Sequence, residues 1–288
     1  MESPRRVQHT ARRAIFDAML LNELSCLVVE RTLLYSIHLR RYVTVDFYLP
    51  KNIADPASLS LLLINDGQDL VKMPFDTLLN TMLDEGRLQP VLCVGIHCGP
   101  NRKMEYGTAR VLDFKGRGAK AAAHERFVTE RLLPHLQSAY CIPSFRQMAY
   151  AGFSLGGLSA IDIVWNHPEL FRLAGVFSGS LWWRSKDLED GYVEDTDRIM
   201  HAQVRAGKLH KGQRFYFTTG SLDETSDRNH NGIIDSIDDT LSLIDELKDK
   251  GYTDEDICYV NYEDGKHDVD TWGRAFPHFL EWAFGKDA

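Results

Sequence analysis

Short runs of apolar residues recur along the chain at the lengths expected of β-strands. The runs at 61–64 and 91–96 are wholly apolar, which is typical of strands buried on both faces of a parallel sheet. Before them, residues 27–37 and 42–49 favour an antiparallel hairpin. Further strand-like runs lie at 147–151, 173–177, 214–218 and 257–260.

Segments of helical character separate these runs, at 74–83, 124–140, 157–165 and about 238–250. Alternating strands and helices predict an α/β fold, with a doubly wound, mostly parallel sheet and an antiparallel N-terminal hairpin. We expect one domain over residues 26–288, preceded by a helical arm over residues 1–25. Within the domain, residues 181–212 are expected to form a lid or a pocket wall.

The amino-acid composition argues against several classes of function. The chain has 288 residues, a net charge of −8 and dispersed Lys and Arg, which argues against a nucleic-acid partner. Its five cysteines are scattered without a CxxC pair, so neither a disulfide framework nor a cysteine zinc site is expected. No signal peptide and no apolar run of membrane-spanning length is evident, which predicts a cytoplasmic protein with no membrane partner.

Ser154 stands in the pentapeptide Gly152-Phe153-Ser154-Leu155-Gly156, between a strand-like run and a helix-like segment. A sharp strand-to-helix turn exposes a serine Oγ at the carboxyl edge of a sheet, and flanking glycines relieve the crowding there. We therefore predict that Ser154 is a nucleophile. The alternative is an ordinary glycine-rich turn.

A serine hydroxyl needs a neighbouring base, and that base needs a carboxylate to fix its tautomer. In α/β-hydrolases these partners follow the serine in the order acid, then histidine, each after a later strand. Asp223 and Glu224 follow the run at 214–218, and His267 follows the run that begins at 257. We predict His267 as the general base and Asp223 as the acid, with Glu224 as the alternative acid.

The oxyanion formed during ester cleavage needs two N–H donors. The backbone N–H of Leu155, directly after the nucleophile, is one candidate. The other should come from the loop after the strand at 61–64, and Gln68 is the expected donor.

Several motifs in one order resemble the putative-esterase (esterase D-like) family of the α/β-hydrolase superfamily. They are Asp66-Gly67-Gln68, residues 101–106, residues 152–157, residues 177–183, and Gly265-Lys266-His267-Asp268 with Trp272. The resemblance covers about residues 27–285, and the family includes enterochelin esterases, feruloyl esterases, S-formylglutathione hydrolases and mycolyltransferases. It implies a cofactor-free hydrolase that acts on small carboxylic esters.

The resemblance also suggests roles for other residues. In the feruloyl-esterase branch the acid follows a glycine by three positions, which corresponds to Asp223. Arg102 and Glu105 match a polar pair of the enterochelin-esterase branch, and they would either anchor substrate or pin their loop to the sheet. Trp182 and Trp183 suggest an aromatic pocket wall, with core packing as the alternative.

An insertion at 227–238 has the spacing of a calcium loop. Oxygen-bearing side chains stand at its first, third and fifth positions, a glycine stands at the sixth, and an acid closes the twelfth. The predicted ligands of a structural Ca²⁺ are Asp227, Asn229, Asn231, the Ile233 carbonyl, Asp235 and Asp238. An Asn/Asp-rich turn that caps the next helix is the alternative.

These features together predict a serine carboxylic ester hydrolase that works through an acyl-enzyme. The same triad would serve an acyltransferase in which an alcohol replaces water. A non-catalytic, calcium-dependent binding protein on a hydrolase fold is the third possibility.

Overall fold

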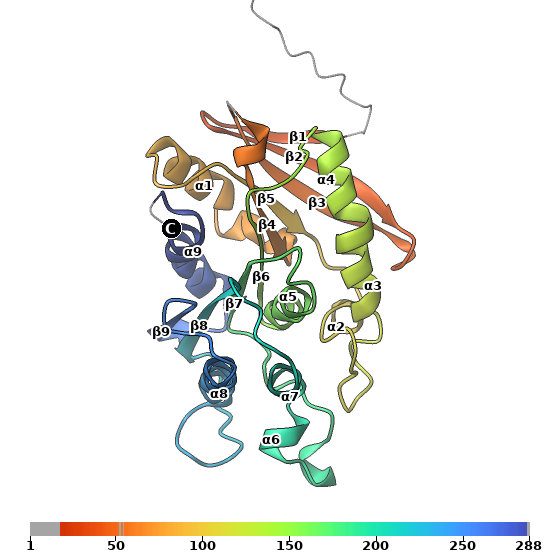
Figure 1. The fold of residues 1–288 in the computed structure, drawn as a ribbon, viewed down its shortest axis with the longest axis vertical. Coiled ribbons are helices and arrows are strands. Elements are labelled where there is room, and N and C mark those ends of the chain that lie inside the picture. The colour runs from red at the N-terminus through yellow and green to blue at the C-terminus, as the bar shows by residue number, and fades with distance from the viewer. Residues whose placement is uncertain (1–17, 52, 54, 287–288) are drawn as a thin grey trace, which may run out of the picture.

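The computed structural model describes residues 18–51, 53 and 55–286, and these form a mixed nine-stranded sheet with helices on both faces (Figure 1). The strands are β1 (Met19–Glu23), β2 (Leu27–Ser36), β3 (Arg41–Pro50), β4 (Ser60–Asn65), β5 (Val91–Ile96), β6 (Met148–Phe153), β7 (Leu173–Phe177), β8 (Arg214–Leu222) and β9 (Ile257–Lys266).

The strand order is β1-β2-β3-β5-β4-β6-β7-β8-β9. The pairs from β1 to β5 at the N-terminal side are antiparallel, and every pair from β5 to β9 is parallel. This confirms the predicted α/β-hydrolase class and its N-terminal hairpin. Because β4 to β9 run in one direction, the loops that follow them meet at one edge of the sheet, where open α/β sheets bind ligands.

Helices and helical turns connect these strands. They are η1 (Pro56–Ser58), η2 (Gly67–Lys72), α1 (Phe75–Asp84), α2 (Arg102–Glu105), α3 (Ala121–Arg126), the π turn η3 (Phe127–Leu132), α4 (Leu133–Ala139), α5 (Leu155–Asn166), η4 (Leu188–Asp190), α6 (Glu194–Asp197), α7 (Ile199–Ala206), α8 (Asp235–Asp249) and α9 (Val269–Phe284). The insertion predicted at 181–212 contains η4, α6 and α7.

The core has two layers because side chains alternate across each strand. On β4, Leu61 and Leu63 pack toward α3, α4, α5, α7 and α8, whereas Leu62 and Ile64 pack toward α1 and α9. Figure 1 shows α1 and α9 together on one side of the sheet and α4, α5 and α7 on the other. Both faces of the central strands are therefore buried, as their uninterrupted apolar sequence predicts.

The helical arm predicted at the N-terminus is wrong where the structure describes it. Residues 1–17 lie outside the described residues, and Met19–Glu23 form strand β1, paired antiparallel with β2. The side chains of Met19, Leu20 and Leu21 are exposed, so no buried face supports a helix there. Pairing with β2 instead satisfies the backbone groups at the open edge of the sheet.

Two other boundaries differ from prediction for local reasons. The helix predicted at 124–140 is interrupted by η3, which ends two residues before Pro134. The missing N–H of Pro134 removes one hydrogen bond of a regular helix. Strands β8 and β9 extend to Leu222 and Lys266, beyond their apolar runs, with an irregular register between Gly220 and Leu222. As a result, His267 directly follows a strand.

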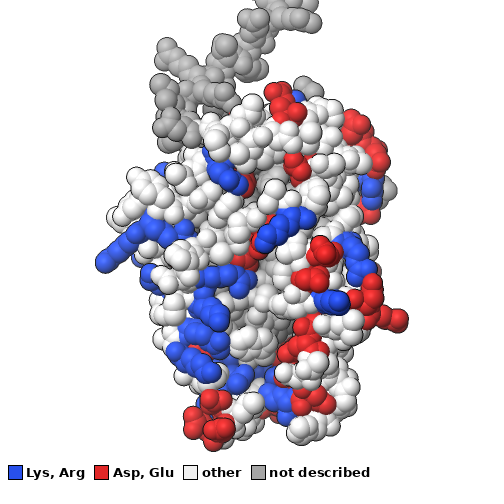
Figure 2. Space-filling model, turned by 180° about the vertical axis from the view of Figure 1, so that it is seen from behind, with Lys and Arg blue, Asp and Glu red and all other residues white. Residues whose placement is uncertain are grey.

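Charge is unevenly distributed on the surface. Seen from behind, Lys and Arg side chains gather in a band along the lower left of the molecule, while Asp and Glu predominate on the right (Figure 2). Side chains of opposite charge therefore occupy different parts of this face. No helix within the described ranges combines the length and the apolar character that a bilayer crossing needs.

Candidate active site

Ser154 occupies the turn between β6 and α5 in a strained conformation, with φ 54° and ψ −122°. Close packing enforces this turn. A Cβ added to Gly152 would lie 2.3 Å from the Gly156 oxygen, and one added to Gly156 would lie 2.6 Å from Asp66 Oδ2. Only glycine fits at either position, so the pentapeptide forms the strand-turn-helix elbow that its sequence indicates.

The hydroxyl of Ser154 lies near a second serine. Ser154 Oγ is 3.3 Å from Ser180 Oγ, and the Ser180 N–H donates to the Ser154 carbonyl over 3.1 Å. Within the described part of the chain, no hydrogen bond joins Ser154 to His267. Ser180 belongs to the motif at residues 177–183, but nothing in the sequence places it beside Ser154.

Asp223 and His267 lie next to each other at the carboxyl ends of β8 and β9. Asp223 Oδ1 is 4.0 Å from His267 Nδ1. The Asp223 side chain is fully buried, and its Oδ2 accepts the Gly220 N–H over 3.0 Å. Its Oδ1 makes no hydrogen bond to another described residue. The carboxylate is thus aimed at the imidazole but stands just beyond hydrogen-bond distance.

The environment changes the pKa of both groups. Burial raises the pKa of Asp223, against the opposing effects of the Gly220 N–H, the Ser178 hydroxyl and His267. Burial also lowers the pKa of His267 below 6.5; Asp223 opposes this shift, and Arg102 adds to it. A lowered pKa keeps the imidazole neutral at neutral pH, and a neutral imidazole can accept a proton.

Trp272 was missed as a contributor to this site, although it belongs to one of the motifs. Its ring stacks on Phe153 at 5.1 Å and meets the His267 ring edge-on at 5.2 Å. Its Nε1 donates to Ser178 Oγ over 3.0 Å. Trp272 therefore packs between the nucleophile strand and the imidazole.

Glu224, the alternative acid, lies in a different environment. Burial raises the pKa of Glu224, as does the nearby charge of Asp235, while the Ser236 N–H lowers it. These neighbours belong to the start of α8, not to the loop of His267. Of the two adjacent acids, the structure therefore brings Asp223 to the imidazole.

The loop predicted to complete the oxyanion hole is packed against the elbow. Asn65 Nδ2 donates to the Gly156 carbonyl over 2.9 Å, which fixes the end of β4 to the start of α5. Gln68 follows in η2, and its Oε1 accepts the Cys98 N–H over 3.1 Å. Leu155 begins α5, where a backbone N–H has no helical partner. The backbone N–H groups of Leu155 and Gln68 thus belong to two segments in direct contact.

Arg102 and Glu105 do not pair with each other. Both Arg102 Nε and Nη2 donate to the Asp66 carboxylate over 2.7 Å, and Nη2 also reaches the Phe153 carbonyl over 3.2 Å. Glu105 is buried and forms a two-point ion pair with Arg41. Glu105 therefore pins its loop to β3 and its carboxylate is engaged there, whereas Arg102 joins the loop after β4 to the end of strand β6.

The two tryptophans predicted for a pocket wall differ in exposure. Trp183 is 1% exposed and belongs to the core, so the packing alternative applies to it. Trp182 is partly exposed. The Arg117 guanidinium lies over both rings, 5.2 Å from the centre of Trp182 and 4.8 Å from that of Trp183. Only Trp182 retains surface that a ligand could contact.

The loop at 227–238 is closed by its own hydrogen bonds. Asp227 accepts the N–H groups of Asn231 and Gly232, and Asp238 accepts the side-chain amides of Asn229 and Asn231. Asp235 instead faces Arg228, and Ile233 is exposed. Among the described residues, no group of three or more His, Cys, Asp or Glu side chains is arranged to hold a metal ion.

Two competing histidines are engaged elsewhere, as expected for residues outside the triad. His97 bonds to Asp46 over 2.8 Å, and His278 bonds to the Tyr216 hydroxyl over 2.9 Å. Two cavities, of about 660 Å³ beside Trp282 and about 520 Å³ beside Trp165, include none of the proposed triad residues.

Residues 36–283 match the family model described as putative esterase. The chain belongs to the putative-esterase family. The family description names an esterase activity, and Ser154 at the strand-to-helix elbow is compatible with that chemistry.

The similar proteins are distant in sequence. An uncharacterized protein of Bacillus subtilis (strain 168), YbbA, is 24% identical over 254 residues, with 83% of this chain and 92% of that protein covered. The enterochelin esterase of Shigella flexneri has a similar structure, with a TM-score of 0.68 at 19% identity, covering 92% of this chain. This chain spans 60% of that protein's length.

A shorter neighbour is similar over most of its own length. The IroE-like serine hydrolase of Shewanella oneidensis matches with a TM-score of 0.64 at 19% identity, covering 88% of this chain and 80% of that one. At such identities, the structural similarity establishes the fold alone.

Proposed function

We propose that this protein hydrolyses small carboxylic esters through a Ser154-His267-Asp223 triad and an acyl-enzyme. The observation that carries the proposal is the strained Ser154 elbow at the sheet edge where His267 and Asp223 stand 4.0 Å apart. Family membership supplies the reaction class.

In the proposed mechanism, His267 accepts the Ser154 proton as Oγ attacks the ester carbonyl, and Asp223 holds the imidazole in the required tautomer. The N–H groups of Leu155 and Gln68 stabilise the oxyanion. His267 then returns the proton to the departing alcohol, and it activates water to release the acyl group. Ser154 Oγ must turn from Ser180 toward His267 for the first step.

The substrate is proposed only by class. Similar structures include enterobactin esterases and a ferulic acid esterase, so siderophore and feruloyl esters are candidates. Acetylated sugars and simple short-chain esters are further candidates that these structures do not name. A panel that varies the acyl and the alcohol part separately would rank them. Adding a competing alcohol and analysing products separates hydrolysis from acyl transfer.

The decisive experiment is Ser154→Ala. We expect it to lower turnover of p-nitrophenyl acetate by on the order of 10⁴-fold or more, with an unchanged fold. A fluorophosphonate probe should label the native protein at Ser154 and leave the variant unlabelled. Ser180→Ala is the matched control, because Ser180 lies beside the nucleophile without standing in the elbow. Activity that survives Ser154→Ala would refute the proposal.

We also propose that the loop at 227–238 binds a structural Ca²⁺. The turn in which Asp227 accepts successive backbone N–H groups supports this, as do the Asn229, Asn231 and Asp238 oxygens that lie within one loop. Asp235 fits less well, since Arg228 occupies its carboxylate. Hard oxygen ligands of this kind suit calcium.

Calcium removal tests this second proposal. A chelator should lower the melting temperature by about 5 °C, the loss expected when a ligand that stabilises the folded state by one to three kcal/mol is withdrawn. Added Ca²⁺ should restore the value, and Asp227→Asn should abolish the response. Identical melting curves with and without the chelator would refute the proposed calcium site.

A further inference from the structure

The segment between Asp223 and α8 has one deeply buried side chain. Residues 224–234 contain neither helix nor strand, and most of their side chains are at least partly exposed. The side chain of Arg228 is the exception, with an exposed fraction of 6%. A buried guanidinium in an otherwise superficial loop needs partners, and its partners determine where the loop lies.

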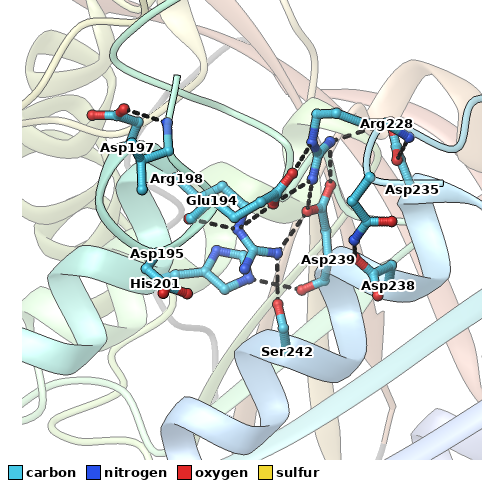
Figure 3. Close-up of polar contacts among 12 residues, drawn as sticks. Glu194, Asp195, Asp197, Arg198, His201, Arg228, Asp235, Asp238, Asp239 and Ser242 are labelled. Atoms are coloured by element: carbon cyan, nitrogen blue, oxygen red, sulfur yellow. Dashed lines mark hydrogen bonds and ion pairs between the residues drawn. The ribbon is translucent and has the colours of Figure 1, made fainter. Parts of the chain in front are cut away.

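Arg228 binds two other segments at once (Figure 3). Its Nε and Nη2 donate to Glu194 in α6 over 2.5 and 3.0 Å, and Nη2 also donates to Asp239 in α8 over 2.6 Å. Its Nη1 stands 3.2 Å from Asp235 Oδ2. The loop is thereby fastened to the insertion on one side and to α8 on the other.

A second buried arginine reaches the same carboxylate from the insertion. Arg198, whose side chain is also 6% exposed, donates to Asp239 Oδ1 over 2.8 Å and to Ser242 Oγ over 2.6 Å (Figure 3). The Asp239 side chain is 1% exposed. Because a buried charge left unpaired is strongly unfavourable, this cluster of Arg198, Arg228, Glu194 and Asp239 resists separation of the segments it joins.

Backbone contacts extend this fastening along the loop toward Asp223. The Arg228 N–H donates to Asp235 Oδ1 over 2.8 Å, and the Asp235 N–H donates to the Ser226 carbonyl over 2.8 Å. The loop is thus closed at Ser226, three residues after Asp223. Between them, Glu224 is half-buried beside Asp235 and Asp239, with the Ser236 N–H near its carboxylate.

Few contacts hold Asp223 on the side that faces His267. Asp223 Oδ2 accepts the Gly220 N–H and the Ser178 hydroxyl lies near the carboxylate, but Oδ1, which faces His267, accepts no hydrogen bond from a described residue. At 4.0 Å from the imidazole, a shift of about one ångström decides whether the bond forms. A displacement of that size at a reacting group can cost about 100-fold in rate.

We propose that Arg228 is a positioning residue for the catalytic acid: by tying the loop to Asp239 and Glu194, it holds Asp223 within reach of His267. This inference rests on the proposed triad. Arg228 acts through its forked guanidinium, which bonds both carboxylates simultaneously, and a lysine ammonium cannot reproduce that geometry.

Arg228→Gln tests the proposal on the full-length protein, with kinetics expressed per active site titrated by a fluorophosphonate. We expect kcat for p-nitrophenyl acetate to fall about 10- to 100-fold. KM should change by less than about twofold, since Arg228 is not placed to touch substrate. The pH midpoint of kcat/KM should also move down, because Asp223 raises the pKa of His267 and its retreat removes that effect. Arg228→Lys should be intermediate.

Arg205→Gln is the matched control. Arg205 in α7 forms a similar two-point pair with Glu246 in α8, but its side chain is 41% exposed and it lies outside the acid loop. We expect its kcat and pH midpoint to equal those of the native protein. The comparison is repeated with a chelator present, so that any ion in the loop does not mask the effect of Arg228.

If Arg228→Gln does not fold, Glu194→Gln tests whether the contacts of Arg228 position Asp223. Glu194 is 29% exposed, so its replacement leaves less uncompensated charge, and we expect a several-fold fall in kcat with the same downward pH shift. Native kcat and pH midpoint in every folded variant of this pair overturn the inference. If Ser154→Ala is inactive in that case, the proposed esterase mechanism still holds although Arg228 does not position the acid. An active Ser154→Ala variant would refute both the mechanism and the role of Arg228.

Discussion

The nucleophile and the acid–base pair of the proposed triad are held by contacts of different kinds. Around Ser154, backbone atoms leave no room for a side chain at Gly152, and the Asp66 side chain crowds Gly156. Arg102 ties the loop that carries Asp66 to the same elbow. Asp223 and His267 stand on loops, with 4.0 Å between their facing atoms and a fully buried but unbonded carboxylate oxygen. The position of Ser154 is therefore fixed by close packing, whereas the positions of Asp223 and His267 depend on contacts with segments that are distant in the sequence.

This difference separates two requirements of the reaction. The elbow and the oxyanion donors must be in place before substrate arrives, since their value lies in preorganisation. Catalytic hydrogen bonds are often long in a free enzyme and tighten only when substrate binds, so the 4.0 Å between Asp223 and His267 is compatible with their proposed roles. We therefore expect changes at the elbow to affect stability and rate together, and changes at the acid to affect mainly rate.

Among the changes that test this comparison, the largest expected effect concerns the two adjacent acids. Asp223→Asn should lower kcat by about 10³- to 10⁴-fold, because the histidine loses the group that orients it. Glu224→Gln should lower kcat about fivefold or less, since the amide oxygen can still accept the Ser236 N–H. Steady-state kinetics of both variants measure this contrast. A larger loss in Glu224→Gln than in Asp223→Asn would reverse the assignment.

A smaller effect is expected at the packed elbow. Gly156→Ala places a methyl group 2.6 Å from Asp66 Oδ2, which should cost about 1–3 kcal/mol in the free energy of unfolding and about tenfold in kcat. Gly273→Ala in α9 is the control, because its methyl group would meet Met73 at an ordinary 3.5 Å. Alanine there should stabilise by up to about 1 kcal/mol. Equal stability of the two variants in denaturant unfolding would contradict the packed elbow.

The smallest effect is a displacement of the pH profile. Only neutral His267 can act as a base, so kcat/KM should rise with pH and reach half its maximum below pH 6.5, because burial lowers the pKa of His267. Arg102 contributes to that lowering, so Arg102→Gln should move the midpoint to higher pH. A native midpoint above 6.5 would show that the imidazole is less buried than described.

Local sequence patterns predicted the elements whose position follows from the polarity of neighbouring residues. The apolar runs located the central strands, and Gly152 to Gly156 with the later acid and histidine predicted the elbow and the order of the triad. The helical prediction for residues 19–23 was wrong because the side chains of residues 19–21 are exposed and present no apolar face to the core. Their pairing with the predicted strand β2 is seen only in the folded sheet.

The partners of charged side chains could not be predicted in the same way. Glu105 binds Arg41 and not Arg102, Glu224 turns toward α8, and Arg228 joins an insertion to a helix. Each of these contacts links residues that lie far apart in the chain or on opposite sides of a turn. The sequence by itself determined where the central strands lie and where a strained serine must stand, because both follow from neighbouring residues. Tertiary structure alone decided which carboxylate faces the histidine and what holds it there, because a charge takes its partner from whatever the fold brings within about 3 Å.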